Sequence, residues 1–337
     1  MKPDLSTRYL GLRLAHPLIA SASPLTSTCE GMCALEEAGA AAVVMRSLFE
    51  AQVQAEDTAY TVYSEHGSYS QAEAGSYFPE LPSYDKGVSG HLQSLRNAVE
   101  AVNIPIIASL NAVSLEGWVD YAMRLEAAGA AALELNAYFI PGDFRMSGRD
   151  VESHYIEVVS AVKRSVSLPV SVKLSPHFSS IGHMAHQLVD AGADGLVLFN
   201  RFYQPDFDLA TLSVKSDLKL SSAQDTGPPL LWIALLSARL RGSLAATSGV
   251  ETIEQVVKYL LVGADAVMTT SALLRHGATY MRLLVAGLRT WLDEHGHASV
   301  AAIRGLRRVT DVEQADVLLR AQYMTLLTDY VPGRLAA

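Results

Sequence analysis

Four near-copies of one short phrase recur along the chain and constrain its fold more than any other feature. They read AGAAAVVM from Ala38, AGAAALEL from Ala128, AGADGLVL from Ala191 and VGADAVMT from Val262. Each follows an amphipathic helical pattern and leads into a short apolar run. Glycine suits the cap after a helix because it tolerates positive φ, and an unbroken apolar run suits a buried parallel strand. Each phrase therefore predicts a helix-to-strand junction.

Further strand candidates lie between these phrases, at residues 17–22, 104–110, 169–174 and 243–247. Helical patterns separate them, for example at 115–128, 151–166, 183–191 and 253–262. The result is eight strands alternating with helices, which predicts a closed (β/α)8 TIM barrel of the α/β class. Half of the 337 residues are hydrophobic, enough for the core of one large barrel, so we expect a single domain over residues 1–337.

Three segments exceed a minimal barrel. A long insertion covers about residues 49–90 after strand two, another covers 200–229 after strand six, and a C-terminal helical extension covers 298–337. Long loops at the carboxyl ends of barrel strands commonly carry ligand contacts, although surface decoration is an equal alternative.

Charge and composition exclude several classes of protein. A net charge of −9 without a dense Lys/Arg run argues against nucleic-acid binding. The longest apolar runs are too short to cross a bilayer, and the first residues lack the apolar core of a signal peptide. Cys29 and Cys33 lie one helical turn apart with no partner set for a metal, so we interpret them as core thiols. We expect a cytoplasmic protein with no metal site and no membrane segment.

The active sites of barrels lie at the carboxyl ends of the strands. We therefore expect the functional side chains among the residues that end the eight strands. These are Ala22 and Ser23, Arg46 and Ser47, Asn111, Asn136, Lys173, Asn200, Ser248 and Gly249, and Thr270 and Ser271.

The last two pairs fit a phosphate site built from the loops after strands seven and eight. Ser248-Gly249 and Thr270-Ser271 offer hydroxyls and close backbone approach. The alternative is that they cap the two following helices, and the two roles can coexist.

Lys173 closes the apolar run Val170-Ser171-Val172 at a strand end. A buried ammonium there would cost several kcal/mol, as an order of magnitude, unless an anionic group meets it. A cofactor ring that carries negative charge would meet this need. The alternative is a lysine that reaches solvent.

Motifs in the order HPLIASAS, LELN, VKLSPHF, TSGVET and VGADAVMTTSAL resemble the dihydroorotate dehydrogenase family, which are FMN-containing barrel oxidoreductases. The resemblance covers His16 to Gly305. It implies that Ala22 and Ser23 lie beside the flavin and that Lys173 contacts the ring near N1 and O2, where it stabilises the reduced anion. It also implies that FMN is the cofactor and that the protein is a homodimer.

The remaining site residues follow from the same resemblance. The FMN phosphate would be held by Ser248, Gly249, Thr270 and Ser271. Arg46 replaces the lysine usual after strand two, with Ser47 beside it. Asn111, Asn136 and Asn200 match or lie near amide positions that contact flavin or substrate in the family.

The chain departs from the family directly after Asn136. Relatives that oxidise dihydroorotate carry a Cys or Ser base there, whereas this chain reads Ala137-Tyr138-Phe139. Phenylalanine cannot remove a proton. Tyr138 is either a proton donor, acting with Asn136 and Lys173 as the catalytic set, or an aromatic wall. Glu134, two residues before Asn136, should face the same side, its charge met by Lys173 or Arg46.

Three hypotheses follow. The first is an FMN-dependent oxidoreductase acting on dihydroorotate or a related small unsaturated or cyclic acid, with a soluble electron acceptor. The second is an FMN protein of the same fold that passes electrons to a redox partner. The third is a non-flavin barrel in which Lys173 forms a Schiff base.

Overall fold

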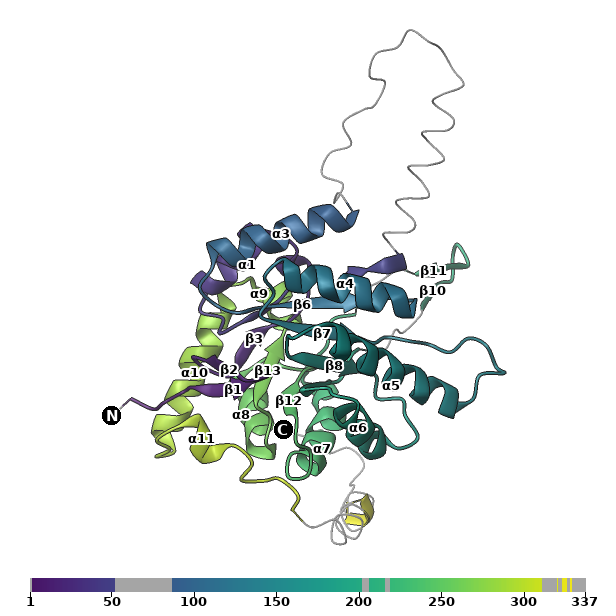
Figure 1. The fold of residues 1–337 in the computed structure, drawn as a ribbon. Helices are drawn as coiled ribbons and strands as arrows, with labels where there is room; N and C mark the ends of the chain where they lie inside the picture. Colours follow the sequence, from purple (N-terminus) through teal and green to yellow (C-terminus); the bar gives the residue numbers. More distant parts are fainter. Residues whose placement is uncertain are drawn as a thin grey trace, which may run out of the picture.

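Parallel strands form the centre of the molecule, and helices surround them (Figure 1). The computed structural model describes residues 2–51, 87–201, 206–215 and 219–310, together with 320, 323–325 and 328. Within these residues eight parallel strands close into a barrel, which confirms the predicted (β/α)8 fold. In chain order they are β3 (Leu18–Ala20), β4 (Val43–Val44), β6 (Ile106–Asn111), β7 (Ala132–Asn136), β8 (Val170–Leu174), β9 (Gly195–Leu198), β12 (Ser243–Ala246) and β13 (Ala266–Thr269).

Strand two is interrupted. After β4, the short strand β5 (Leu48–Phe49) continues along the same neighbour, so that both β4 and β5 pair with β6. The pairing of Val43 with Ile106 closes the barrel. Met45 bridges the two pieces, because its N–H donates to the Ile107 carbonyl at 2.8 Å.

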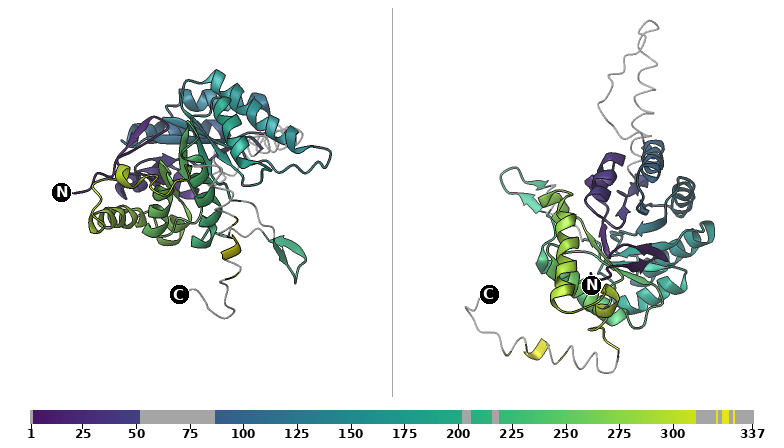
Figure 2. Two further views of the ribbon diagram at one scale, coloured as in Figure 1. Left: turned by 90° about the horizontal axis from the view of Figure 1, so that it is seen from below. Right: turned by 90° about the vertical axis from the view of Figure 1, so that its left-hand side faces the viewer.

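Helices cover the outside of the barrel, as the two further views show (Figure 2). Their bounds are α1 (Cys29–Glu37), α3 (Gly87–Ala101), α4 (Leu115–Ala127), α5 (Gly148–Ser165), α6 (Ile181–Asp190), α7 (Gly227–Leu236), α8 (Ile253–Val262), α9 (Ser271–His276), α10 (Tyr280–Glu294) and α11 (Val300–Ile303). No helix in the described ranges is long and apolar enough to span a membrane.

The four repeated phrases are helix-to-strand junctions, as predicted. Their glycines, Gly39, Gly129, Gly192 and Gly263, have φ of 87°, 96°, 109° and 109°. A side chain is strained in this left-handed region, and glycine is not. Each glycine ends a helix, and the apolar run after it enters the barrel as β4, β7, β9 or β13.

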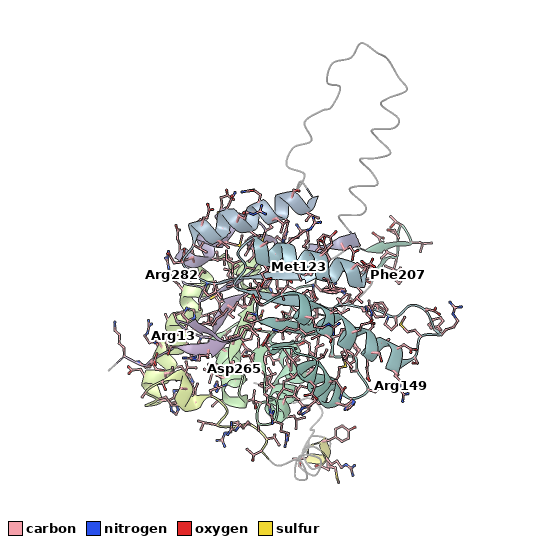
Figure 3. All side chains as sticks on the ribbon, in the orientation of Figure 1. Arg13, Met123, Arg149, Phe207, Asp265 and Arg282 are labelled. Atoms are coloured by element: carbon pink, nitrogen blue, oxygen red, sulfur yellow. The ribbon has the colours of Figure 1, made fainter. Side chains whose placement is uncertain are left out.

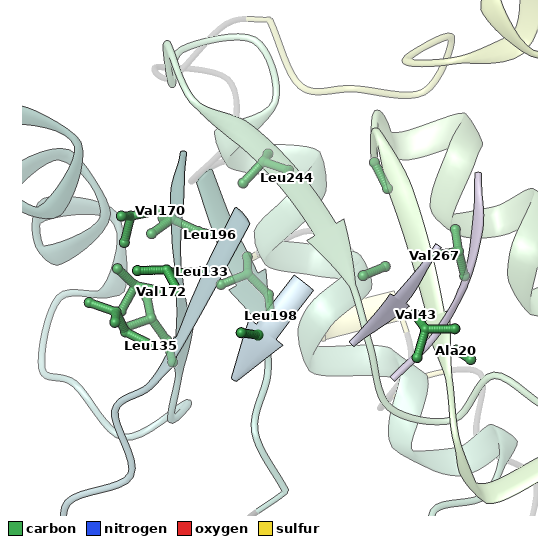
Figure 4. Packing of buried hydrophobic residues seen from close by; sticks show 14 of the residues in the cluster. Ala20, Val43, Leu133, Leu135, Val170, Val172, Leu196, Leu198, Leu244 and Val267 are labelled. Atoms are coloured by element: carbon green, nitrogen blue, oxygen red, sulfur yellow. The ribbon is translucent and has the colours of Figure 1, made fainter. Parts of the chain in front are cut away.

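Strand alternation divides the core in two. Outward-facing residues such as Leu133, Val172 and Leu196 pack under the helices (Figure 4). Inward-facing residues such as Ile107, Ala132 and Val197 fill the barrel. An antiparallel hairpin of β1 (Thr7–Tyr9) and β2 (Leu12–Leu14) covers the amino end of the barrel strands. Its buried side chains join the inner cluster. This hairpin was not predicted from the sequence.

The three extra segments are described in part. Residues 52–86, most of the first insertion, lie outside the described residues. The second insertion holds an antiparallel hairpin of β10 (Asp206–Asp208) and β11 (Ser213–Lys215), on which Phe207 is exposed (Figure 3), and a short 3-10 helix, η2 (Ala223–Thr226). The C-terminal extension contributes α11, and most of its remainder is outside the described residues. The single domain over residues 1–337 stays a prediction.

Cys29 and Cys33 both lie in α1 with free thiols. They are half-buried and pack against the outer core. This placement agrees with their interpretation as core residues.

Glu50 ties the root of the first insertion to α4. Its buried carboxylate accepts hydrogen bonds from Val113 N (2.5 Å), Ser114 N (3.0 Å) and Ser114 Oγ (2.8 Å). A negative charge at a helix N-terminus is also favoured by the helix dipole. Burial raises the pKa of Glu50, but these hydrogen bonds outweigh it, and the net shift is downward.

Replacing Glu50 with glutamine should lower the free energy of unfolding by about 2–3 kcal/mol at pH 7. A carboxyl group with a lowered folded pKa stabilises above its unfolded pKa, about 4.3, and loses this contribution as the pH falls through the folded pKa. The difference between wild type and Glu50→Gln in denaturant titrations should therefore shrink below about pH 4. Glu116→Gln, an exposed carboxylate in the first turn of the same helix, is the control and should change stability by less than about 1 kcal/mol. A pH-independent difference would contradict the assignment.

Candidate functional site

Two polar layers lie inside the carboxyl end of the barrel, above the apolar inner core. Strand register places Ser109 of β6 beside Glu134 of β7, and Glu134 beside Ser171 of β8. One pleat higher, Asn136 of β7 lies beside Lys173 of β8. Because side chains alternate along a strand, both layers point inward. The predicted shared face of Glu134 and Asn136 is thus confirmed.

Glu134 and Lys173 form an ion pair in these layers. The Glu134 carboxylate is fully buried, and its Oε1 lies 3.8 Å from Lys173 Nζ. The Lys173 side chain is only 12% exposed, which argues against a lysine that reaches bulk solvent. The sequence predicts Lys173 or Arg46 as the cation that pairs with Glu134. In the structure the partner is Lys173, and the Arg46 side chain is exposed.

Asn136 is the centre of a hydrogen-bond network at the barrel mouth. Its Nδ2 donates to Ser47 Oγ at 3.2 Å, and its Oδ1 accepts from Asn200 Nδ2 at 2.5 Å. Asn111 Nδ2 donates to the Asn136 carbonyl at 2.8 Å. Four predicted site residues from four strand ends are therefore in direct contact.

Ser47 connects this network to Glu134. Its hydroxyl lies 2.8 Å from Ser109 Oγ, and Ser109 Oγ donates to Glu134 Oε1 at 3.4 Å. Ser109 was not among the predicted site residues. Its position two residues before Asn111 was the available signal, because that spacing puts both on one face of the strand.

The segment after β7 is held by α5. Tyr155 donates from its hydroxyl to the Ala137 carbonyl at 2.8 Å and contacts Phe178 edge-on. Burial is the main cause that raises the pKa of Tyr155 to about 12, so it acts as a neutral donor. Tyr138 is half-buried, and its N–H donates to the Asn136 carbonyl at 2.8 Å. Phe139 is 37% exposed and contacts His154.

The ends of β12 and β13 meet η2 and the segment before it. Ser271 Oγ accepts from Ser221 N at 3.0 Å and lies 2.9 Å from Ser221 Oγ. Ser248 and Gly249 adopt left-handed φ of 77° and 71°. Ser248 Oγ donates to the Phe199 carbonyl at 3.2 Å, and Thr270 Oγ1 is buried with no hydrogen-bond partner among the described residues.

The alternative capping role is wrong for Ser248 and Gly249, whereas Thr270 is the N-cap residue of α9. Thr252, not Ser248, is the N-cap of α8, in a capping box with Gln255. Thr270 precedes α9, but its side chain makes no capping hydrogen bond. The first helix begins at Ile253, as predicted, which leaves Ser248 and Gly249 in a turn above β12.

Ala22 and Ser23 follow β3 at the same end of the barrel. Ser23 is buried and caps a 3-10 helix, η1 (Pro24–Thr26), with its hydroxyl accepting from Leu25 N at 3.2 Å. Arg46 is exposed, and its guanidinium has no hydrogen-bond or ion-pair partner among the residues that the structure describes. The structure therefore does not bring Arg46 into the polar network.

Arg201 follows Asn200 but faces a different group. Its Nη1 lies 3.7 Å from Asp225 Oδ2 in η2. No cluster of three or more His, Cys, Asp or Glu side chains suited to a metal ion occurs in the described part of the chain.

The chain is similar over most of its length to curated dehydrogenases, although no family model matches it. The catalytic subunit of dihydroorotate dehydrogenase B (NAD(+)) from Pyrococcus furiosus is 30% identical over 213 residues, which cover 61% of this chain and 70% of the relative. The corresponding subunit from Thermoplasma volcanium is 26% identical, with 90% of this chain and 98% of the relative covered. The chain belongs to the dihydroorotate dehydrogenase family.

Subunit PreA of the NAD-dependent dihydropyrimidine dehydrogenase of Escherichia coli is a more distant relative. It is 24% identical, and the match covers 93% of this chain and 79% of the relative. As a member of this family of dehydrogenases, the protein is an oxidoreductase that acts on CH–CH donors. Among the described residues, Glu134, Asn136 and Lys173 are polar side chains that face the interior of this barrel at the carboxyl end of its strands.

Proposed function

We propose that the protein is an FMN-dependent oxidoreductase that moves a hydride between the flavin and dihydroorotate or a related small cyclic or unsaturated acid. The observation that carries this proposal is the Lys173 ammonium, held inside the barrel mouth beside Glu134 and in register with Asn136. A cation in a water-poor site stabilises negative charge far more than it would in water. Bound FMN would supply the hydride acceptor and donor.

The residues present fit FMN. The buried Thr270 hydroxyl, which has no hydrogen-bond partner in the described part of the chain, is a donor suited to a phosphate oxygen. The left-handed turn at Ser248-Gly249 lies in the loop after strand seven, where barrels commonly bind phosphate. At the other side of the mouth, Lys173 and the amides supply a cation and neutral donors for a polar ring.

In this proposal Ser248, Gly249, Thr270 and Ser271 hold the phosphate, and Lys173 faces the ring. Ser47, Asn111, Asn136 and Asn200 orient flavin or substrate, since hydrogen bonds from Asn136 and its neighbours already hold these four residues together. Ala22 and Ser23, which follow β3 at the same end of the barrel, would line the flavin. We retain Arg46 only as an electrostatic contributor at the rim, because its side chain is exposed.

The Schiff-base alternative is less well supported. It requires the Lys173 nitrogen to attack a carbonyl carbon, whereas this nitrogen is paired with the buried Glu134 carboxylate, 3.8 Å away. The electron-transfer alternative keeps FMN and dispenses with a base. It is favoured by the sequence Ala137-Tyr138-Phe139, which has no Cys or Ser after Asn136.

The flavin spectrum tests the proposal directly. The purified protein, reconstituted with FMN, should be yellow, and anaerobic addition of dihydroorotate should bleach it. Dihydrouracil, which has the same ring without the carboxylate, is the matched control for recognition of the acid. A colourless protein that binds no FMN would remove both flavin hypotheses, whereas a yellow protein that dihydroorotate leaves unchanged would leave the electron-transfer role.

Replacing Tyr138 with phenylalanine should reduce the rate of flavin oxidation by an unsaturated acid about 100-fold if the phenol delivers the proton. FMN affinity should be unchanged, since the ring remains. Phe139→Leu is the control, because it changes the neighbouring aromatic residue without removing a proton donor. Stopped-flow measurement of flavin reoxidation gives both rates. Equal rates for wild type and Tyr138→Phe would assign Tyr138 to packing alone.

We further propose a single-domain cytoplasmic homodimer that uses a soluble electron acceptor or redox partner. Two free cysteines are in keeping with a reducing compartment. Sedimentation of the purified protein measures the oligomeric state.

A further inference from the structure

The buried Glu134 carboxylate has no assigned role in the proposed reaction, and its surroundings are unusual. It is 0% exposed in the interior of the barrel. Its Oε1 lies 3.8 Å from Lys173 Nζ and accepts from Ser109 Oγ at a long 3.4 Å. Its Oε2 has no hydrogen-bond partner among the described residues.

The stability of the fold does not account for this carboxylate. Removing a charge from water is costly, and attraction to a partner repays that cost only when the geometry is close and the remaining lone pairs are satisfied. Glu134 meets neither condition, and an apolar residue would suit the barrel interior at least as well. Burial and then the Glu134 charge also raise the pKa of Tyr9, which lies at the closed end of the barrel and stays neutral.

Glu134 is connected to two residues that the proposed function places at the flavin. It pairs directly with Lys173. On its other side, hydrogen bonds run from Glu134 through Ser109 and Ser47 to the Asn136 amide. A substitution of Glu134 therefore affects both Lys173, through the ion pair, and Asn136, through the two serines.

We propose that Glu134 is a positioning residue that holds the Lys173 ammonium in place and offsets part of its positive charge. It thereby makes the midpoint potential of the bound flavin lower than Lys173 alone would set it. Negative charge near the ring disfavours the reduced, anionic flavin, and a cation favours it. This inference rests on the proposed function, because it concerns a flavin bound beside Lys173.

The first test measures the midpoint potential of the bound flavin in a spectroelectrochemical titration. Glu134→Gln keeps the shape and removes the charge, and should raise the ratio of reduced to oxidised flavin at a fixed potential about tenfold, which is about 30 mV for a two-electron couple. Lys173→Met should shift the potential in the opposite direction. Asp265→Asn is the control: Asp265 is a mostly buried carboxylate paired with Arg304, placed directly before β13 at the amino end of the barrel (Figure 3). It should leave the potential unchanged.

The second test needs no flavin. In thermal unfolding of the flavin-free protein, Glu134→Gln and Lys173→Met should each lower the unfolding temperature, because each leaves one buried polar group without its partner. The double variant, Glu134→Gln with Lys173→Met, should lose less stability than the two single losses added together. If a single variant does not fold and the double variant does, the pairing is equally supported.

These measurements separate two kinds of failure. A wild type that binds no FMN contradicts the proposed function, while the double-variant comparison still judges the pairing. A wild type that binds FMN, with a Glu134→Gln potential equal to its own, overturns the role of Glu134 alone. Strictly additive stability effects would overturn the pairing.

Discussion

Lys173→Met should slow reduction of the bound flavin by its substrate about 100- to 1000-fold, the range seen when a single electrostatic contact to a developing charge is removed. The reason is the position of the ammonium, 12% exposed and held inside the barrel mouth. Methionine has similar length and no charge. Rapid-mixing reduction kinetics at saturating FMN measure the effect.

The same substitution should lower the free energy of unfolding by about 3–5 kcal/mol, because it leaves the buried Glu134 carboxylate without its cation. Lys163→Met is the matched control. Lys163 Nζ pairs with Asp194 at 2.7 Å and donates to the Leu168 carbonyl, at the amino end of β8 and β9. This variant should lose stability and keep wild-type reduction kinetics. Normal kinetics in folded Lys173→Met would remove the role of Lys173.

Gly249→Ala should cost about 3 kcal/mol of stability through two additive effects, backbone strain and steric overlap. Gly249 has a φ of 71°, and an added Cβ would lie 2.6 Å from the Ser222 carbonyl oxygen and 2.7 Å from Thr226 Cγ2. The backbone at Gly249 and the segment from Ser222 to Thr226, which contains η2, would have to move apart. Because the proposed phosphate site lies at this turn, FMN affinity should also fall at least about tenfold, which is about 1.4 kcal/mol.

Gly296→Ala separates strain from overlap. Gly296 has nearly the same φ, 70°, but an added Cβ there meets no atom within 4 Å. It should cost only the strain of the left-handed conformation, about 1–2 kcal/mol, with unchanged FMN affinity. Denaturant titration and fluorescence titration with FMN measure the two quantities. Equal losses in both variants would contradict the close packing of η2 on Gly249.

The main functional question is how proton transfer occurs at the residues that directly follow β7. Asn136 is fixed by three other site residues, so its placement resembles what the family comparison implied. Directly after it, Tyr155 fixes the Ala137 carbonyl, and Tyr138 and Phe139 occupy positions where a base would be expected. The chain therefore combines a preserved amide network with an altered site for proton transfer.

The sequence by itself determined the barrel. Helix-ending glycines and apolar runs are local signals, because backbone φ and burial of both faces of a strand depend on residues close in the chain. The period of two along β7 likewise placed Glu134 and Asn136 on one face. Phosphate-site candidates followed from strand order alone, and so did the start of α8 at Ile253 from its helical pattern, whereas the cap at Thr252 depends on a side-chain geometry that spacing does not reveal.

Only the tertiary structure decided which residues meet. The choice of Lys173 over Arg46 as the partner of Glu134 depends on the register between β7 and β8, a property of two strands together. The register between β6 and β7 places Ser109 beside Glu134, and Ser47 connects Ser109 to Asn136. Glu50 reaches the start of α4 from 63 residues away. Such contacts result from closure of the barrel, because closure sets the height of each strand relative to its neighbours.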